Sequence, residues 1–343
     1  MKKITTLALC LGLGVLGGCA SNQSLDELPP MPAAEPSVDD VNLANGMDEP
    51  NPLDNTPDEA DQSNDLWARL RKGYGLDLTV ENDRIRVQRD WYARHPQYFT
   101  RVTTRSERYL HYIIEQAEAR NMPLELALLP IVESAFDPFA YSHGRAAGPW
   151  QFIPSTGDYF GMKRTWWEDQ RRDILKSTNA ALDYLQKLSS RFDGDWLLAL
   201  ASYNAGGGTV SRAIRRNEEA GRPTDFWHLD LPRETTAYVP KLLAIAQIVQ
   251  APETYGVTLH PIQNEAYFST VETGGQIDLT QAARLADISV EELYLLNPSF
   301  NRWATSPDGP HRLLVPVDRE ERFRTGLAEL PEGQRMQWVR YEI

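Results

Sequence analysis

The chain has 343 residues, of which 41% are hydrophobic and 24% are charged, so it is long enough for one sizeable folded domain and a smaller second one. Its formal net charge is −13, but residues 20–66 contain twelve acidic residues and neither Lys nor Arg, which leaves about −3 for residues 67–343. The acidity therefore belongs to one segment and does not define the ligand of the folded part. The pair Arg215-Arg216 is too short a basic run to indicate a nucleic-acid partner.

The N-terminus has the pattern of a secretory signal. Two lysines precede an apolar run, residues 4–16, which is too short to span a bilayer. The run ends in LGGC, which resembles a bacterial lipobox, so we expect residues 1–18 to be a signal peptide and Cys19 to be the lipidated N-terminus. Lipid chains hold a protein at a membrane by burying methylene groups, each contributing ~0.8 kcal/mol. Ala20 after the cysteine favours the outer membrane, facing the periplasm; an ordinary signal peptide with a chance Cys is the alternative.

Residues 19–66 have the composition of a disordered acidic tether. They contain many acidic residues and prolines and almost no aromatic side chains. Such a segment cannot bury enough apolar surface to offset the entropy lost on ordering. Aromatic residues become frequent at Trp67, where we place the start of the folded part.

Helical periodicity dominates the next part of the chain, residues 67–260. Five stretches read as helices: in four of them apolar residues recur at three- and four-residue steps, and the fourth in chain order, residues 195–204, is apolar on nearly all sides and should be a central buried helix. The third stretch begins at Ser177, a suitable N-cap, and the fifth contains Pro240, which we expect to kink the helix or mark its start. The expected helices cover residues 104–122, a stretch from Pro123 to 132, and residues 177–192, 195–204 and 233–250. We therefore predict a mainly α fold with a compact helical domain.

The pattern changes after Pro252. "TLHPIQNEAYFSTVETGG" has strand character, residues 278–300 read as two short helices separated by a turn at residues 287–289, and "HRLLVPV" reads as a strand. We therefore predict a small βααβ module over residues 261–320, followed by a tail, residues 321–343.

The apolar run of residues 128–132 ends on the carboxylate of Glu133. Apolar surroundings disfavour the charged form of a carboxyl group and raise its pKa. A protonated carboxyl is what cleavage of a glycosidic bond requires, because the leaving oxygen must receive a proton. The alternative at this point is a buried Glu133 paired with Arg145 or Arg171.

Four motifs give Glu133 a context. In chain order they are "ESAFDP", "SHGRAAGPWQF", "ASYNAGGG" and "RETTAYVPK". Together they resemble the Slt-type soluble lytic transglycosylase domain, and in particular the membrane-bound lytic murein transglycosylase D family, over about residues 67–260. The resemblance implies a lysozyme-like fold and no cofactor. It also implies that the partner is the glycan strand of peptidoglycan, cut at the β-1,4 bond between N-acetylmuramic acid and N-acetylglucosamine.

The resemblance implies a single catalytic carboxyl, Glu133. It would protonate the glycosidic oxygen and then accept a proton from the muramic C6 hydroxyl, which closes a 1,6-anhydro ring. A hydrolase would need a second carboxylate, and the spare ones nearest in sequence are Asp137, Asp158 and Asp173; the first reads as a turn residue and the last as a cap or an arginine partner. A muramidase that uses water, and a wall-binding lipoprotein with a retired site, remain the alternatives.

The resemblance also implies a set of residues that bind the substrate or support Glu133. The serines would donate hydrogen bonds, the amides suit N-acetyl groups, the tyrosines would steady developing charge and the indole would form the apolar floor of a saccharide subsite. Ordinary packing is the alternative for each. The residues are Ser134, Ser142, Trp150, Gln151, Tyr203, Asn204 and Tyr238.

Other signals are weak. The six histidines are scattered without the spacing of metal ligands, and "NAGGGT" lacks the Lys and the preceding strand of a phosphate-binding loop, so we expect no metal site. The βααβ module loosely resembles a LysM peptidoglycan-binding module, with "VETGG" where such modules have a Gly-Asp turn. Glycan binding is one role for it, and a structural appendage packed against the catalytic domain is the role we favour.

Overall fold

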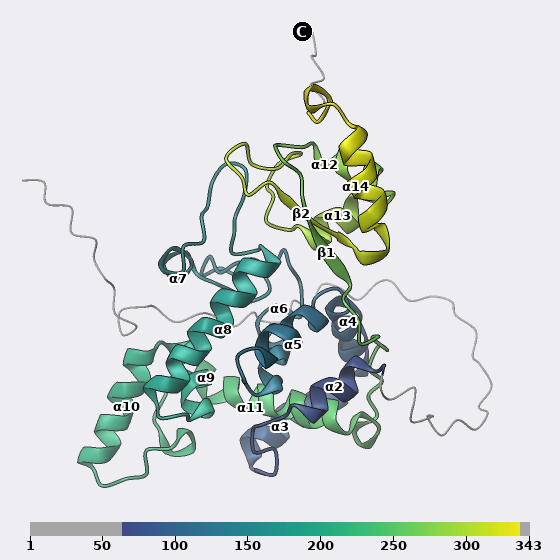
Figure 1. The fold of residues 1–343 in the computed structure, drawn as a ribbon. Helices are drawn as coiled ribbons and strands as arrows, with labels where there is room; N and C mark the ends of the chain where they lie inside the picture. The colour runs from purple at the N-terminus through teal and green to yellow at the C-terminus, as the bar shows by residue number, and fades with distance from the viewer. Residues whose placement is uncertain (1–63, 337–343) are drawn as a thin grey trace, which may run out of the picture.

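The computed structural model describes residues 64–336 (Figure 1). The predicted signal peptide, the predicted lipidation site Cys19 and nearly all of the predicted tether lie outside these residues. Within residues 64–336, no helix combines the length and the apolar character needed to cross a bilayer.

The first part of the described chain is a helical domain. This confirms the mainly α fold class. The short helices α6 (Leu129–Ser134) and α7 (Pro154–Tyr159) flank the loop that carries "SHGRAAGPWQF". The helices are α2 (Leu66–Lys72), α3 (Asp83–Ala93), α4 (Pro96–Ser106), α5 (Leu110–Glu118), η2 (Leu124–Leu128), α6 (Leu129–Ser134), α7 (Pro154–Tyr159), α8 (Ile174–Arg191), α9 (Trp196–Ala205), α10 (Gly207–Glu219), η3 (Phe226–His228), α11 (Arg233–Gln250) and η4 (Pro252–Tyr255).

The central helix α9 explains how distant motifs come together. It is apolar on nearly all sides because it packs against α8, α10 and α11, so most of its residues are buried. Helix α11 packs in turn against α3, α9 and α6. It matches the predicted range, and Pro240 lies inside it without marking its start. The C-terminal end of α9, the first turns of α11 and the end of α6 therefore share one region of the core.

Three predicted helix boundaries are wrong. Residues 104–122 do not form one helix, because α4 ends at Ser106 and α5 begins at Leu110. Near this break the hydroxyls of Thr103 and Ser106 donate to backbone carbonyls three or four residues earlier, which competes with helical hydrogen bonding. The next stretch is divided between η2 and α6, with Pro130 in the first turn of α6, where a missing N–H is tolerated. Finally, α8 begins at Ile174 and its N-cap is Asp173, not Ser177.

The second part is a small module that contains a two-stranded sheet (Figure 1). Strand β1 pairs antiparallel with β2, so that Phe268 faces Pro316 and Glu272 faces Arg312. Two short helices lie between the strands, which confirms the βααβ pattern. The elements are β1 (Phe268–Glu272), α12 (Leu279–Ala286), α13 (Val290–Leu296), β2 (Arg312–Pro316), η5 (Val317–Arg319), α14 (Glu320–Glu329) and η6 (Glu332–Gln334).

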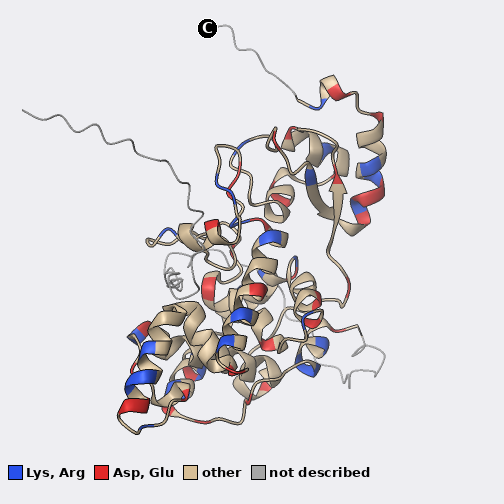
Figure 2. Cartoon of the chain, turned by 60° about the vertical axis from the view of Figure 1, so that its left-hand side comes forward, with Lys and Arg blue, Asp and Glu red and all other residues tan. Residues whose placement is uncertain are grey.

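The module continues beyond the range that the sequence suggested. We expected a tail from residue 321, but α14 packs against α12 and buries Phe323 and Leu327 in the module's own apolar core. The apolar face of α14 is narrow and half of its ten residues are charged, so the helix resembles a polar segment when read in isolation. Acidic and basic residues are mixed along this outer helix and over the rest of the folded part (Figure 2).

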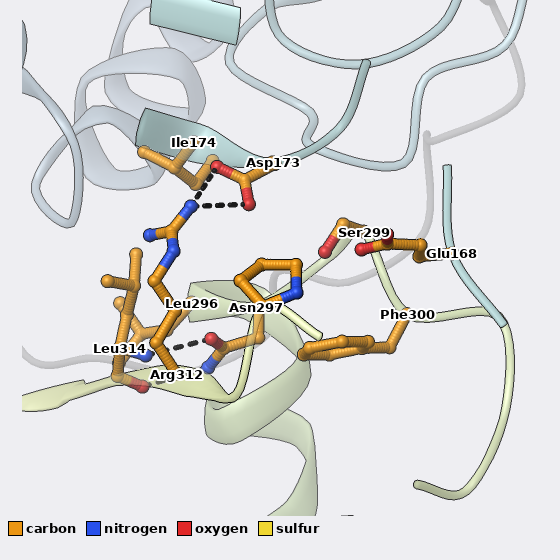
Figure 3. A pocket seen from close by; sticks show the side chains of 10 residues that line it. Glu168, Asp173, Ile174, Leu296, Asn297, Ser299, Phe300, Arg312 and Leu314 are labelled. Carbon is orange, nitrogen blue, oxygen red and sulfur yellow. Dashed lines mark hydrogen bonds and ion pairs between the residues drawn. The ribbon is translucent and has the colours of Figure 1, made fainter. Parts of the chain in front are cut away.

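The module packs directly against the helical domain. Arg108 donates to the carboxylate of Glu292 at 2.6 Å, and the hydroxyl of Tyr109 donates to the backbone carbonyl of Leu295 at 2.8 Å. On the other side of the interface Arg312 extends from β2 to Asp173, with N–O distances of 2.8 and 3.1 Å (Figure 3). The cavity beside this ion pair has a volume of about 10 Å³, which is room for one water molecule. The interface is therefore closely packed beside this ion pair.

Asp173 both caps helix α8 and pairs with Arg312, so two different substitutions of this residue can separate the contributions of the cap and of the ion pair to stability. One carboxylate oxygen caps α8 by accepting from the N–H of Lys176, and both accept from Arg312. We expect Asp173→Ala to lower the free energy of unfolding by about 1–3 kcal/mol, because cap and ion pair are both lost. Asp173→Asn keeps the cap acceptor and should lose less.

Urea denaturation of the parent and both variants measures these losses. The control is Asp83→Ala, which breaks a solvent-exposed pair with Arg86 and should change stability by no more than about 0.5 kcal/mol. Equal stability of Asp173→Ala and the parent would show that neither the cap nor the ion pair of Asp173 stabilises the fold.

Candidate active site

Glu133 lies in the last turn of α6, a helix whose six residues are all buried. The helix ends abruptly because Ala135 and Phe136 follow it with φ of 52° and 55°, in the left-handed region that residues with a Cβ avoid. Two consecutive residues in this region cost free energy, and such costs are concentrated at functional sites. The turn directs the chain away immediately after Glu133 and Ser134.

The carboxyl group of Glu133 is fully buried, with 0% of the residue exposed. The hydroxyl of Tyr238 donates a hydrogen bond to Oε1, and Oε2 has no hydrogen-bond partner. Burial raises the pKa of Glu133 well above its ordinary value; the Tyr238 hydrogen bond opposes this, and the charge of Glu234 adds to it. Burial therefore favours the uncharged form of this carboxyl.

The alternative partners considered for Glu133 are engaged elsewhere or lie at the surface. Arg171 forms an ion pair with Asp169 at 2.6 Å and donates to the backbone carbonyls of Arg145 and Phe152 at 2.6 and 3.0 Å. Arg145 is itself exposed. No guanidinium neutralises Glu133 within the part of the chain that the structure describes, and its side-chain partner is the phenol of Tyr238.

Two buried tyrosines belong to this site. Tyr238 comes from the second turn of α11 and Tyr203 from the end of α9, and both are almost fully buried. Burial raises the pKa of each phenol well above its ordinary value, and Glu133, when it is ionised, raises both further. Both phenols therefore remain protonated and act as donors: Tyr238 toward Glu133, and Tyr203 toward the backbone carbonyl of Trp150 at 3.1 Å.

Gln151 offers an unused acceptor. Its backbone has a φ of 49°, and its side-chain amide donates to the carbonyl of Gly148 at 2.8 Å. The Oε1 atom is buried and has no partner. Gly148 is required at its position, since its φ is +83° and a Cβ there would lie 2.3 Å from the carbonyl oxygen of Arg171. The loop is thus closely fitted around Gln151.

Asn204 links the end of α9 to the start of α11. Its Nδ2 donates to Glu234 at 3.2 Å and its Oδ1 accepts from the hydroxyl of Thr235 at 2.7 Å. Sequence reasoning placed Glu234 in the motif "RETTAYVPK" but gave it no role in the site.

The remaining predicted residues have structural contacts. Ser134 donates to the carbonyl of Pro149 at 3.0 Å and so ties α6 to the loop before Gln151. The hydroxyl of Ser142 accepts from the N–H of Ala146 within its own loop. The indole of Trp150 is fully buried and donates to Thr178 at 3.0 Å, so its ring packs in the core and does not form the open floor that we expected.

One link between the site and the module was not foreseen. The loop of residues 163–173 contacts the module through the N–H of Asp169, which donates to the carbonyl of Ser299, and through the N–H of Asn301, which donates to the carbonyl of Trp167. The same loop contains Arg171, which holds the segment around Gln151. The module therefore supports the site through this loop. Residues 64–336 contain no cluster of three or more His, Cys, Asp or Glu side chains that could hold a metal ion.

Comparison with known proteins gives two family matches. Residues 111–226 match the transglycosylase SLT domain, and residues 267–332 match the LysM-like domain of lytic transglycosylase MltD. The second match includes α14, in agreement with its packing on the module.

Several curated relatives are similar over longer stretches. The membrane-bound lytic murein transglycosylases D of Escherichia coli strains K12 and O6:H1 are each 44% identical over 265 residues, which are 77% of this chain and 58% of the relative. Membrane-bound lytic murein transglycosylase F of Desulfosudis oleivorans is 31% identical over 143 residues, 40% of this chain and 30% of the relative. The matched part of this chain thus spans somewhat more than half the length of the E. coli proteins.

The buried carboxyl predicts a pH dependence of stability. Above about pH 4.5 the unfolded chain releases the Glu133 proton that the folded state keeps, so the folded state binds more protons and stability falls as pH rises. Glu133→Gln removes this proton difference. We expect the variant to gain stability relative to the parent from about pH 4.5 upward, by up to about 1.4 kcal/mol per pH unit until the pKa of the folded state is reached.

Urea unfolding of both proteins from about pH 4 to 8 measures the difference. Other buried carboxyls, such as Glu125 and Glu168, are present in both proteins and cancel. Parallel pH curves for the two proteins would mean that Glu133 is charged in the folded state.

Proposed function

The chain belongs to the membrane-bound lytic murein transglycosylase D family, and on that premise we propose that it cuts the glycan strands of peptidoglycan without using water. The bond is the β-1,4 link between N-acetylmuramic acid and N-acetylglucosamine. The observation that carries the proposal is the fully buried carboxyl of Glu133, which accepts a hydrogen bond from Tyr238 at Oε1 and leaves Oε2 unpaired.

In the first step Glu133 is the general acid. Its proton passes from Oε2 to the glycosidic oxygen as the bond from that oxygen to C1 of the muramic residue breaks. Glu133 then becomes a carboxylate in a site that disfavours charge, and the hydroxyl of Tyr238 is already in place to stabilise Oε1.

In the second step Glu133 is the general base. Burial makes the new carboxylate a strong base, so it takes the proton of the C6 hydroxyl while the C6 oxygen attacks C1. The products are a 1,6-anhydro-N-acetylmuramic end and a new free hydroxyl on N-acetylglucosamine. The Glu133 proton is restored, and no water and no cofactor take part.

The engagement of the other carboxylates supports this one-carboxyl route. A retaining or inverting hydrolase needs a second carboxyl roughly 5–9.5 Å away. Asp137 accepts from the N–H of Phe139 in a turn, Asp158 pairs with Arg164, and Asp173 pairs with Arg312. Glu234 is near enough for its charge to raise the pKa of Glu133, so it is the second carboxylate that a muramidase mechanism would use. It accepts a hydrogen bond from Asn204.

We assign the supporting residues by their contacts. The free Oε1 of Gln151 would accept from the N–H of an N-acetyl group, and the amide of Asn204 would contact a second one. Tyr203 and Ser134 would position the loop through the carbonyls of Trp150 and Pro149. Ser142 and Trp150 would shape the loop itself.

We place the protein at the outer membrane, facing the periplasm. The lipid on Cys19 would anchor it, and the acidic tether of residues 19–66 would let residues 67–260, the catalytic domain, reach the peptidoglycan layer. The membrane-bound relatives and the lipobox-like sequence support this placement.

Substitution of the acid tests the mechanism. We expect Glu133→Gln to slow the release of soluble fragments from purified sacculi by about 10²–10⁴-fold, because the leaving oxygen no longer receives a proton. Asp137→Asn and Asp158→Asn are the matched carboxyl-to-amide controls and should retain activity. A Glu133→Gln variant that digests sacculi as fast as the parent would exclude Glu133 as the acid.

Product mass separates the lyase from its alternatives. Fragments released by the parent should be lighter by one water than hydrolytic fragments, and digestion in ¹⁸O-labelled water should leave them unlabelled. Labelled products that disappear in Glu234→Gln would indicate a muramidase. Sacculi that stay intact with the parent would indicate a wall-binding protein with a retired site.

A further inference from the structure

Three tryptophans from the two domains lie in the segments that form the interface. Trp166 and Trp167 belong to the loop of the helical domain that contacts the module, and Trp303 belongs to the module loop between α13 and β2. The rings of Trp167 and Trp303 lie edge to face with centroids 5.8 Å apart. Trp166 is 67% exposed and Trp303 is 47% exposed, which is unusual for the largest apolar side chain.

The backbone that carries these rings is fixed. The N–H of Asn301 donates to the carbonyl of Trp167 at 2.7 Å, and the carbonyl of Trp303 accepts from the N–H of Leu279 at 2.7 Å. The hydroxyl of Thr165 accepts from the N–H groups of Trp167 and Glu168, each at 3.1 Å. Because these bonds are made within the free protein, a ligand would meet the rings already ordered and would lose little entropy on binding.

The exposed rings have a cationic neighbour. The guanidinium of Arg302 lies 3.4 Å from the centre of the Trp166 ring, the geometry of a cation–π contact. It covers one face of the indole, while most of Trp166 remains exposed. Exposed indole faces suit the C–H faces of pyranose rings, and a guanidinium beside them suits the carboxylate and carbonyl groups that peptidoglycan carries.

We propose that Trp166, Trp167 and Trp303, together with Arg302, form a platform that binds a glycan strand of peptidoglycan away from the bond being cut. This inference rests on the proposed function, because that function supplies a polymer of sugars as substrate. The platform requires both domains, since each contributes at least one ring.

The connection of the platform to the site favours a glycan strand as its occupant. Four residues after Trp167 the same loop reaches Arg171, which holds the carbonyls of Arg145 and Phe152 on either side of Gln151. A polymer extends well beyond the bond at which it is cut, so a second contact on the loop that supports the site adds to its affinity.

The test uses the full chain with Glu133→Gln, so that the polymer is not digested during binding. Co-sedimentation with purified sacculi is compared for this protein and for versions that also carry Trp166→Ala, Trp303→Ala or both. We expect the double change to weaken sacculus binding at least about tenfold, and Trp166→Phe to weaken it less than Trp166→Ala. Val87→Ala and Val290→Ala alter exposed apolar residues elsewhere on the two domains and should bind as before. Unchanged thermal unfolding confirms that the tryptophan variants are folded.

A second measurement uses the chain with native Glu133. The Trp166→Ala change should slow digestion of sacculi while leaving the turnover of a short soluble glycan fragment unchanged. The platform would be overturned if the tryptophan variants bound sacculi as well as the valine controls do. It would also be overturned if the tryptophan changes weakened binding to lipid vesicles or to another protein but not to sacculi. An equal loss of activity on short fragments would also overturn it. Failure of the proposed function is a separate result, in which the parent itself releases no anhydro product.

Discussion

The carboxyl of Glu133 is stable inside the helical domain only while it is uncharged, and the surrounding structure maintains that condition. Helix α6 is too short and too buried to expose it, and within residues 64–336 its side-chain hydrogen-bond partner is the phenol of Tyr238. A buried carboxylate without a cation would cost several kcal/mol, so burial raises the pKa of Glu133 and favours its protonated form. The same burial keeps a proton on Glu133 for donation and makes its carboxylate form a strong base.

Around this group the protein assembles elements that are far apart in the chain. Helices α9 and α11 pack side by side, which brings Tyr203 and Asn204 next to the start of the helix that carries Tyr238. The loop of Gln151 is held from one side by Ser134 and from the other by Arg171. Each contact is made by a residue whose own position is fixed by packing, which is how a site is kept ordered before substrate binds.

The sequence predicted those features that local pattern or motif determines. Helix α11, buried helix α9 and the βααβ order follow from periodicity, and the burial of Glu133 follows from the apolar run before it. Two residues were read as caps near the start of α8: Ser177, which is wrong, and Asp173, which was read as a cap or an arginine partner and is both. Trp150 was misjudged because nothing local shows that its indole reaches Thr178. The contacts of residues 163–173 with the module join segments more than a hundred residues apart, so no local pattern reports them.

The hydrogen bonds from Asp169 and Asn301 across the interface affect how this protein can be re-engineered. In sequence the C-terminal module looks like a cassette that could be deleted or exchanged for the binding domain of a relative. In three dimensions the module is hydrogen-bonded to the loop of residues 163–173, whose Arg171 in turn holds the segment around Gln151. Removing the module would leave the backbone groups of that loop without partners and the segment around Gln151 less restrained. A successful graft would have to carry the loop of residues 163–173 together with its matching module.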